Sequence, residues 1–180
     1  MKSILGLTLV ILFSYFFKPK NKGYTNSLIT KQYAKKDSLF ELDIRLKGNF
    51  VRIKAPKKLD FELPDHASKI KLIKVHDFNA DSKEDIMVYL GACGTGGCIY
   101  GVFLNQYKNF YRLAYMDYLN NFELKKDKNG YTVIKSYEEA EPYNPSKIYV
   151  SKFKFDKEEY QYKLDTAYIY IDKKNIDYRK

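Results

Sequence analysis

Hydrophobic and polar positions alternate with a period of two along most of the chain after residue 37. In the first such run, 40–46, apolar side chains occupy every second position, as in a strand with one buried face. Gly48-Asn49 separates it from the run 50–54, which is typical of a hairpin. Residues 86–90 are apolar throughout and predict a central strand covered on both faces. Further strands are expected at 70–76, 99–104, 110–116, 121–126, 131–137, 149–155, 160–164 and 168–171.

These short strands, separated by turn residues, predict an all-β domain that is mostly an antiparallel meander, curled into a sandwich or a partial barrel. Few helices are expected, and the best candidate is 25–36. The 18 Tyr and 12 Phe also favour β structure because aromatic side chains fit a pleated surface. We interpret the tyrosines as cross-strand packing, and an aromatic platform for sugars is the alternative.

The N-terminal segment differs from the rest of the chain. Lys2 is followed by the nearly uncharged run 4–17 and then by Lys18, the arrangement of a signal peptide, and the run is shorter than the ~20 residues that span a bilayer. The bulky end at 14–17 offers no clear cleavage site, so an uncleaved anchor that contacts the membrane through 4–17 is the alternative. We expect a periplasmic, cell-envelope or secreted protein. The chain is divided into a signal peptide or membrane anchor (1–20), a linker (21–36) and a single β domain (37–180).

Charge adds little to this picture. The 32 Lys and Arg against 22 Asp and Glu give a net charge of +10, which could favour an anionic partner. The excess is spread thinly, however, and the sequence contains neither a basic helical stripe nor an aromatic RNA-binding motif. We therefore expect no specific nucleic-acid partner, and an envelope protein or a glycan is the expected ligand. A dedicated polyanion site is the alternative.

The clearest candidate chemistry lies between the predicted strands 70–76 and 86–90. Oxygen-bearing side chains stand at positions 1, 3, 5 and 9 of this loop, and on a tightly curling backbone such side chains point inward, as calcium ligands do. A metal-free turn held by hydrogen bonds is the alternative, but three crowded carboxylates would repel one another without a cation. The expected structural calcium ligands are Asp77, Asn79, Asp81, the main-chain carbonyl of Lys83, and Asp85.

The strand, the DxNxDxxxD loop and the following apolar strand resemble the calcium loop of FG-GAP or VCBS-type repeats, which occur in integrin-like propellers and many secreted bacterial proteins. The resemblance implies calcium binding here. Ser82 stands where that family usually has glycine, which eases a sharp turn, and Lys83 adds a positive charge, so weaker binding is implied. Val88 at position 12 does not support an EF-hand. Glu84 is expected to face solvent, and His76 to be a strand residue.

Cys93 and Cys98 are the two cysteines of the chain and enclose a glycine-rich turn. In an exported protein this spacing predicts a disulfide, here at the end of the hairpin between 86–90 and 99–104. Small bacterial envelope proteins have a similar Cys-Gly-rich-Cys turn soon after one calcium loop, and the order here resembles theirs. A nucleophilic or redox role is the alternative, although neither histidine lies in a recognisable catalytic motif.

A hydrolase would need paired carboxylates, and the acidic cluster outside the loop is 138–141. We interpret this cluster as a solvated loop. The sequence thus favours an exported, calcium-stabilised binding or envelope-associated module over an enzyme. One alternative is a secreted hydrolase that uses Glu139 or Glu141. Another is a periplasmic inhibitor or immunity-type protein that binds a toxic enzyme.

Overall fold

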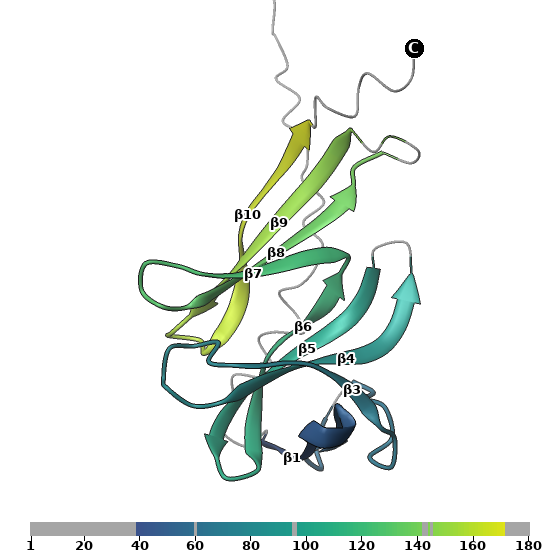
Figure 1. The fold of residues 1–180 in the computed structure, drawn as a ribbon, viewed down its shortest axis with the longest axis vertical. Coiled ribbons are helices and arrows are strands. Elements are labelled where there is room, and N and C mark those ends of the chain that lie inside the picture. The colour runs from purple at the N-terminus through teal and green to yellow at the C-terminus, as the bar shows by residue number, and fades with distance from the viewer. Residues whose placement is uncertain (1–38, 60, 95–96, 142–143, 145, 172–180) are drawn as a thin grey trace, which may run out of the picture.

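The computed structural model describes residues 39–59, 61–94, 97–141, 144 and 146–171 (Figure 1). Ten strands and one short 3-10 turn, η1 (Leu46–Gly48), make up the described secondary structure, which confirms the all-β, antiparallel prediction. The strands are β1 (Leu39–Arg45), β2 (Phe50–Lys54), β3 (Ile70–His76), β4 (Asp85–Gly94), β5 (Gly97–Tyr107), β6 (Phe110–Leu119), β7 (Asn121–Lys126), β8 (Thr132–Glu139), β9 (Lys147–Asp156) and β10 (Gln161–Ile171).

The strands form two sheets, and each is a meander in chain order. Strands β1 to β6 form a barrel that closes where β6 pairs antiparallel with β1. Strands β7 to β10 form a second, four-stranded sheet. Figure 1 shows the second sheet above the barrel, with β10 at its edge. Because the connections join neighbouring strands, the sequence alternation translates directly into this topology.

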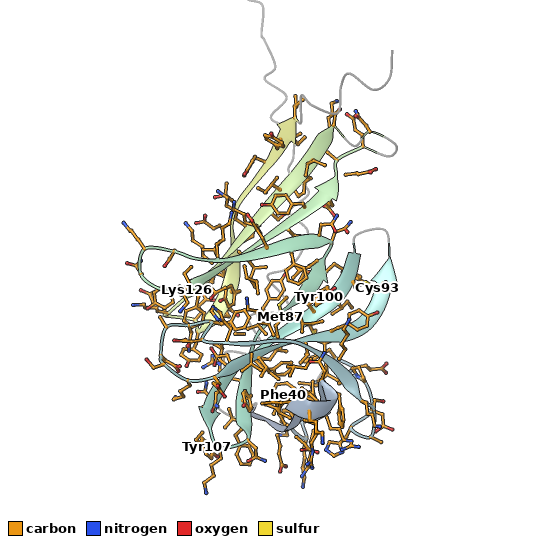
Figure 2. All side chains as sticks on the ribbon, in the orientation of Figure 1. Phe40, Met87, Cys93, Tyr100, Tyr107 and Lys126 are labelled. Atoms are coloured by element: carbon orange, nitrogen blue, oxygen red, sulfur yellow. A yellow bond between two sulfur atoms is a disulfide. The ribbon has the colours of Figure 1, made fainter. Side chains whose placement is uncertain are left out.

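Two hydrophobic cores share the central strands of the barrel. Ile86 and Val88 of β4 pack in the barrel core, whereas Met87 between them packs in the core that includes residues of the second sheet. Figure 2 shows Met87 between the two layers and Phe40 within the barrel. The prediction that 86–90 is a central strand covered on both faces is confirmed. Each such buried side chain contributes about 1.5–3 kcal/mol to the free energy of folding. Because the second core contains residues of both layers, the layers stabilise one another.

Two local predictions were wrong. Leu46 was expected on the buried face of the first strand, but it lies in η1 and is 64% exposed. The chain turns there through a 3-10 turn with Asn49 at φ 52°, a left-handed conformation that asparagine tolerates. The runs 160–164 and 168–171 were expected to be separate strands, yet 161–164 and 168–171 both belong to β10, which is irregular between Leu164 and Thr166. An extra residue there shifts the alternation, which in the sequence resembles a break.

The tyrosines divide into two groups. Tyr111, Tyr115 and Tyr162 are buried in the cores, which agrees with the packing interpretation. Tyr118 and Tyr168 are instead 47% and 40% exposed. Tyr168 still contacts a neighbouring strand, because the ammonium of Lys152 lies 5.5 Å from the centroid of its ring.

The predicted N-terminal segments, 1–20 and 21–36, and the candidate helix at 25–36 lie outside the described residues. Among the residues that are described, the structure contains no helix with the length and apolar character needed to cross a membrane. The N-terminal assignments stay predictions.

Candidate metal centre

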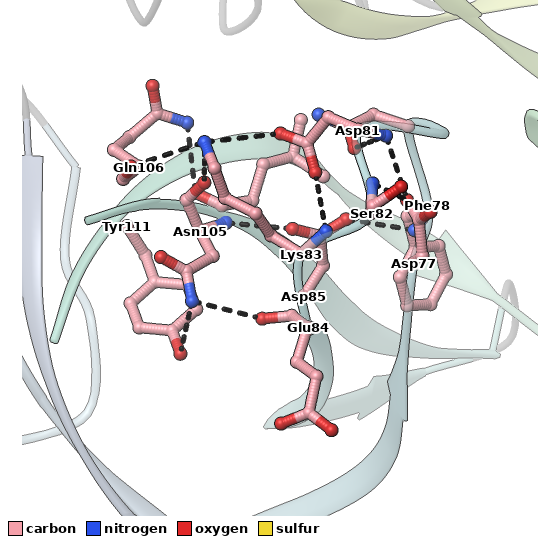
Figure 3. A network of polar contacts seen from close by, with 12 residues as sticks. Asp77, Phe78, Asp81, Ser82, Lys83, Glu84, Asp85, Asn105, Gln106 and Tyr111 are labelled. Carbon is pink, nitrogen blue, oxygen red and sulfur yellow. Dashed lines mark hydrogen bonds and ion pairs between the residues drawn. The ribbon is translucent and has the colours of Figure 1, made fainter. Parts of the chain in front are cut away.

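Three carboxylates converge where the chain passes from β3 to β4. Asp77 follows β3, Asp81 lies in the loop, and Asp85 begins β4. One carboxylate oxygen from each of the three lies within 4.8 Å of the others (Figure 3). The spacing in the sequence thus corresponds to a real cluster in space.

The loop curls tightly because two of its residues adopt left-handed backbone conformations. Ala80 has φ 58° and Ser82 has φ 65°, values that favour glycine and strain other residues. Ser82 is therefore a costly choice at the position where the resembled family has glycine. The turn itself brings the carboxylates of Asp77 and Asp81 towards that of Asp85, and convergence of Asn79 on the same point stays a prediction.

Side-chain oxygens of the loop accept hydrogen bonds from its backbone. Asp77 accepts from the amides of Asp81 at 3.2 Å and Ser82 at 3.1 Å. Asn79 Oδ1 accepts from Asp81 N at 3.2 Å, and Asp81 Oδ1 accepts from Lys83 N at 3.0 Å. These are the bonds of the metal-free alternative, but each carboxylate has about four acceptor positions. The turn bonds and metal coordination are therefore compatible.

Asp85 is the buried anchor of the cluster, with its side chain inaccessible to solvent. Its Oδ2 accepts from Phe78 N and its Oδ1 from Asn105 N, both at 2.8 Å, so the carboxylate ties the loop to β5. Burial raises the pKa of Asp85 to about 6, the two backbone hydrogen bonds oppose the rise, and the charges of Asp81 and Asp77 add to it. A cation beside this group would favour its charged form.

The second sheet holds the other side of the loop. Asn79 Nδ2 donates to the Tyr160 hydroxyl at 3.2 Å. The carbonyl of Phe78 accepts from Thr132 N at 2.9 Å and from the Tyr162 hydroxyl at 3.1 Å. The sequence did not reveal these supporting residues, because they are distant in the chain and belong to no motif. Only their position at the start of predicted strands hinted that they could reach the loop.

Lys83 places a positive charge at the rim of the cluster. Its Nζ lies 3.5 Å from Asp81 Oδ2 and donates to the Gln106 carbonyl at 3.3 Å. This contact accords with weaker cation binding, because the ammonium competes for the Asp81 carboxylate. Coordination by the Lys83 carbonyl stays a prediction. Glu84 is exposed and His76 ends β3, as expected.

The predicted disulfide is present. Cys93 and Cys98 are bonded and are also cross-strand partners near the end of the β4–β5 hairpin. The hydroxyl of Tyr89 lies 3.0 Å from Cys93 Sγ and must be the donor, since a disulfide sulfur has no hydrogen. With both cysteines of the chain bonded, the disulfide acts as a covalent link within the hairpin.

In the acidic cluster at 138–141, burial raises the pKa of Glu138 and the charge of Asp117 adds to the rise, whereas Glu139 and Glu141 have other surroundings. Glu139 ends β8 opposite Ile148, while Glu141 is exposed and ion-paired with Lys147 at 2.5 Å. The hydrogen bond from Lys147 lowers the pKa of Glu141, which is the wrong direction for a general acid. A pocket of the described structure lies elsewhere, on the barrel. It is lined by Glu41, Leu42, Asp43, Ile44, Lys54, His66 and Asn109.

Comparisons with known proteins add no assignment: the chain matches no protein-family model, no curated protein and no solved structure. The resemblance to the FG-GAP and VCBS-type calcium loop therefore depends on the loop residues themselves.

Proposed function

We propose that the chain is an exported binding or envelope-associated module whose fold is stabilised by calcium. The observation that carries the proposal is the convergence of the carboxylates of Asp77, Asp81 and Asp85 within 4.8 Å of one another. The cluster lies in a loop that bonds to both layers of the fold, through Asn105 on β5 and Tyr160 before β10. A cation there would order a loop that contacts both the barrel and the second sheet.

The donor set fits calcium in its chemistry. Carboxylate and amide oxygens are hard ligands, and calcium takes about six to eight of them in flexible geometry. Zinc favours nitrogen and sulfur ligands. Asp77, Asn79, Asp81 and Asp85 would hold the ion, which would offset the mutual repulsion of the carboxylates. Its role would be structural, fixing the strand that begins at Asp85.

The position of the acidic residues favours a binding module over the hydrolase alternative. Glu141 is engaged by Lys147 and by the amide of Asn144 at 2.9 Å. Glu139 lies on β8 opposite Ile148 of β9. An inhibitor or immunity-type role belongs to the same binding class, and its partner would identify it.

Calcium should raise the thermal stability of the protein. With the dissociation constant in the range of about 0.1–1 mM found for extracellular modules, a few millimolar calcium should add only about 1–2 kcal/mol. Melting curves with calcium and with chelator measure this change, and Asp81→Ala should abolish it. Glu84→Ala is the matched control, since Glu84 is exposed in the same loop. If the wild-type protein melts identically in both conditions, calcium does not stabilise it, and hydrogen bonds alone hold the turn.

Residues 1–30 should direct export. The run 4–17 after Lys2 has the composition of a signal peptide or anchor. Fused to a reporter that is active only outside the cytoplasm, this segment should give activity, and replacing two leucines of the run by arginine should remove it. A silent reporter, together with intact protein in the cytosolic fraction, would refute the export part of the proposal.

A further inference from the structure

The second sheet ends in an edge strand that exposes large apolar side chains. Strand β10 lies at one end of the strand order and pairs with β9 alone among the described strands (Figure 1). From Leu164 to Ile171 every residue of β10 is exposed. The large apolar side chains among them are Leu164 (51% exposed), Tyr168 (40%), Ile169 (59%), Tyr170 (53%) and Ile171 (51%). Such an edge is a template for pairing with another chain.

Both faces of this half of β10 are exposed to solvent, although the ammonium of Lys152 lies 5.5 Å from the centroid of the Tyr168 ring. Tyr168 and Tyr170 lie opposite Val150 and Ile148 of β9 and therefore share one face of the sheet. Ile169 and the neighbouring odd positions point to the other face, and they are exposed as well. The beginning of β10, by contrast, is buried. The strand thus extends beyond the part of the sheet that packs on the barrel.

The other edge of the same sheet is protected. Strand β7 carries Glu123, Lys125 and Lys126, and charged side chains on an edge oppose strand addition. The segment 166–171 of β10 contains no charged residue and no proline. The two edges therefore differ in the feature that decides whether another strand can be added.

The unpaired backbone of β10 indicates whether its partner is a lipid surface or another strand. An unpaired strand edge presents amide and carbonyl groups that hydrocarbon cannot satisfy, so open sheet edges do not insert into a bilayer. A second strand satisfies these groups and places its own side chains beside those of β10 on each face of the sheet. The exposed backbone thus requires an extended chain as its partner.

We propose that this partner is a second copy of the protein, joined by antiparallel pairing of the two β10 strands about a two-fold axis at Tyr168. In this register Thr166 faces Tyr170 and Ala167 faces Ile169, so small side chains lie opposite large ones. Because 166–171 is uncharged, the pairing places no like charges opposite one another within the segment. The two sheets become one continuous sheet. The paired segment is short, so the contact buries less area than a standard protein–protein interface, and weak association is expected.

Crosslinking of the full-length chain in its membrane-and-envelope fraction tests the proposed register. At the two-fold axis the two copies of residue 168 lie about 4.5–5.5 Å apart between Cα atoms, within the range a disulfide can bridge. Tyr168→Cys should therefore form a covalent dimer under mild oxidation. Tyr118→Cys is the matched control because Tyr118 is a similarly exposed strand tyrosine outside β10. We expect roughly tenfold more dimer from Tyr168→Cys, since pairing raises the effective local concentration.

A second variant separates specific pairing from crowding. Adding Ile169→Lys to Tyr168→Cys brings the two lysine charges close to the axis and should reduce the dimer to the level of the Tyr118→Cys control. Equal crosslinking of the Tyr168→Cys and Tyr118→Cys variants would overturn the proposal. So would a product whose mass shows β10 joined to a different protein, or crosslinking unaffected by Ile169→Lys. These outcomes do not depend on calcium, whose effect is read separately from the melting curves.

Discussion

Replacing Phe103 by alanine is expected to lower the free energy of unfolding by about 3–5 kcal/mol, the usual cost of deleting a buried phenylalanine ring. Phe103 is fully buried in the barrel core, and its ring packs edge-on against Phe40 with centroids 5.3 Å apart. The space around the ring is tight: a Cβ added at Gly101 would lie 2.9 Å from it. The surrounding chains can therefore collapse only partly into the cavity.

Urea unfolding followed by circular dichroism measures this loss. Tyr107→Ala is the control on the same strand, because Tyr107 is 54% exposed and surface substitutions usually change stability by no more than about 0.5 kcal/mol. A Phe103→Ala protein as stable as the control would show that the ring does not pack within the barrel.

The shape of the unfolding transition tests the relation between the two layers. Strands β4, β5 and β6 contribute residues to both hydrophobic cores, so loss of the barrel core should remove the support of the second sheet. Barrel and second sheet should therefore unfold in one transition, in agreement with a single β domain at 37–180. If the Phe103→Ala protein unfolds in two separate transitions, this expectation is contradicted.

The alternation of apolar and polar residues was sufficient to predict most strands. Strand β3 coincides with the predicted run 70–76, and β2 with 50–54. The continuous apolar run 86–90 predicted burial on both faces because no polar side chain interrupts it. These features are local, so a pattern of neighbouring residues determines them.

Features that depend on distant contacts could not be predicted in the same way. Because of the irregularity after Leu164, the sequence pattern predicted two strands where the structure has one. Ile169 is apolar, yet it is exposed. An apolar residue in a strand pattern predicts burial, whereas its actual environment depends on where the sheet ends. The sequence alone does not show where the sheet ends, so it could not predict this exposure.

The candidate site shows the same division. The spacing of Asp77, Asp81 and Asp85 predicted their convergence, because the turn that brings them together is local. The residues that secure the loop to the rest of the fold, Asn105 and Tyr160, are long-range partners. The sequence thus predicted the carboxylate cluster but not the contacts that hold its loop.

Replacing Asp85 by alanine should lower the free energy of unfolding by about 2–4 kcal/mol even without calcium, because one buried and one partly buried amide lose their acceptor, at up to about 1–3 kcal/mol each. These amides belong to Phe78 and Asn105, at 2.8 Å from the carboxylate. Burial raises the pKa of Asp85 to about 6, so removing an ionised group recovers part of this loss. The loss still dominates because the amides of the loop and of β5 cannot reach another acceptor without moving.

Chemical unfolding in chelator measures this structural part, and the same experiment with calcium measures the second part. Asp85→Ala should be destabilised in chelator and should gain nothing from calcium, whereas Asp81→Ala should lose the calcium response with a smaller loss in chelator, because Asp81 is not buried. Glu84→Ala should match the wild type in both conditions. If Asp85→Ala equals the wild type in chelator, the carboxylate does not join the loop to β5. If it keeps the full calcium response, Asp85 is not a ligand.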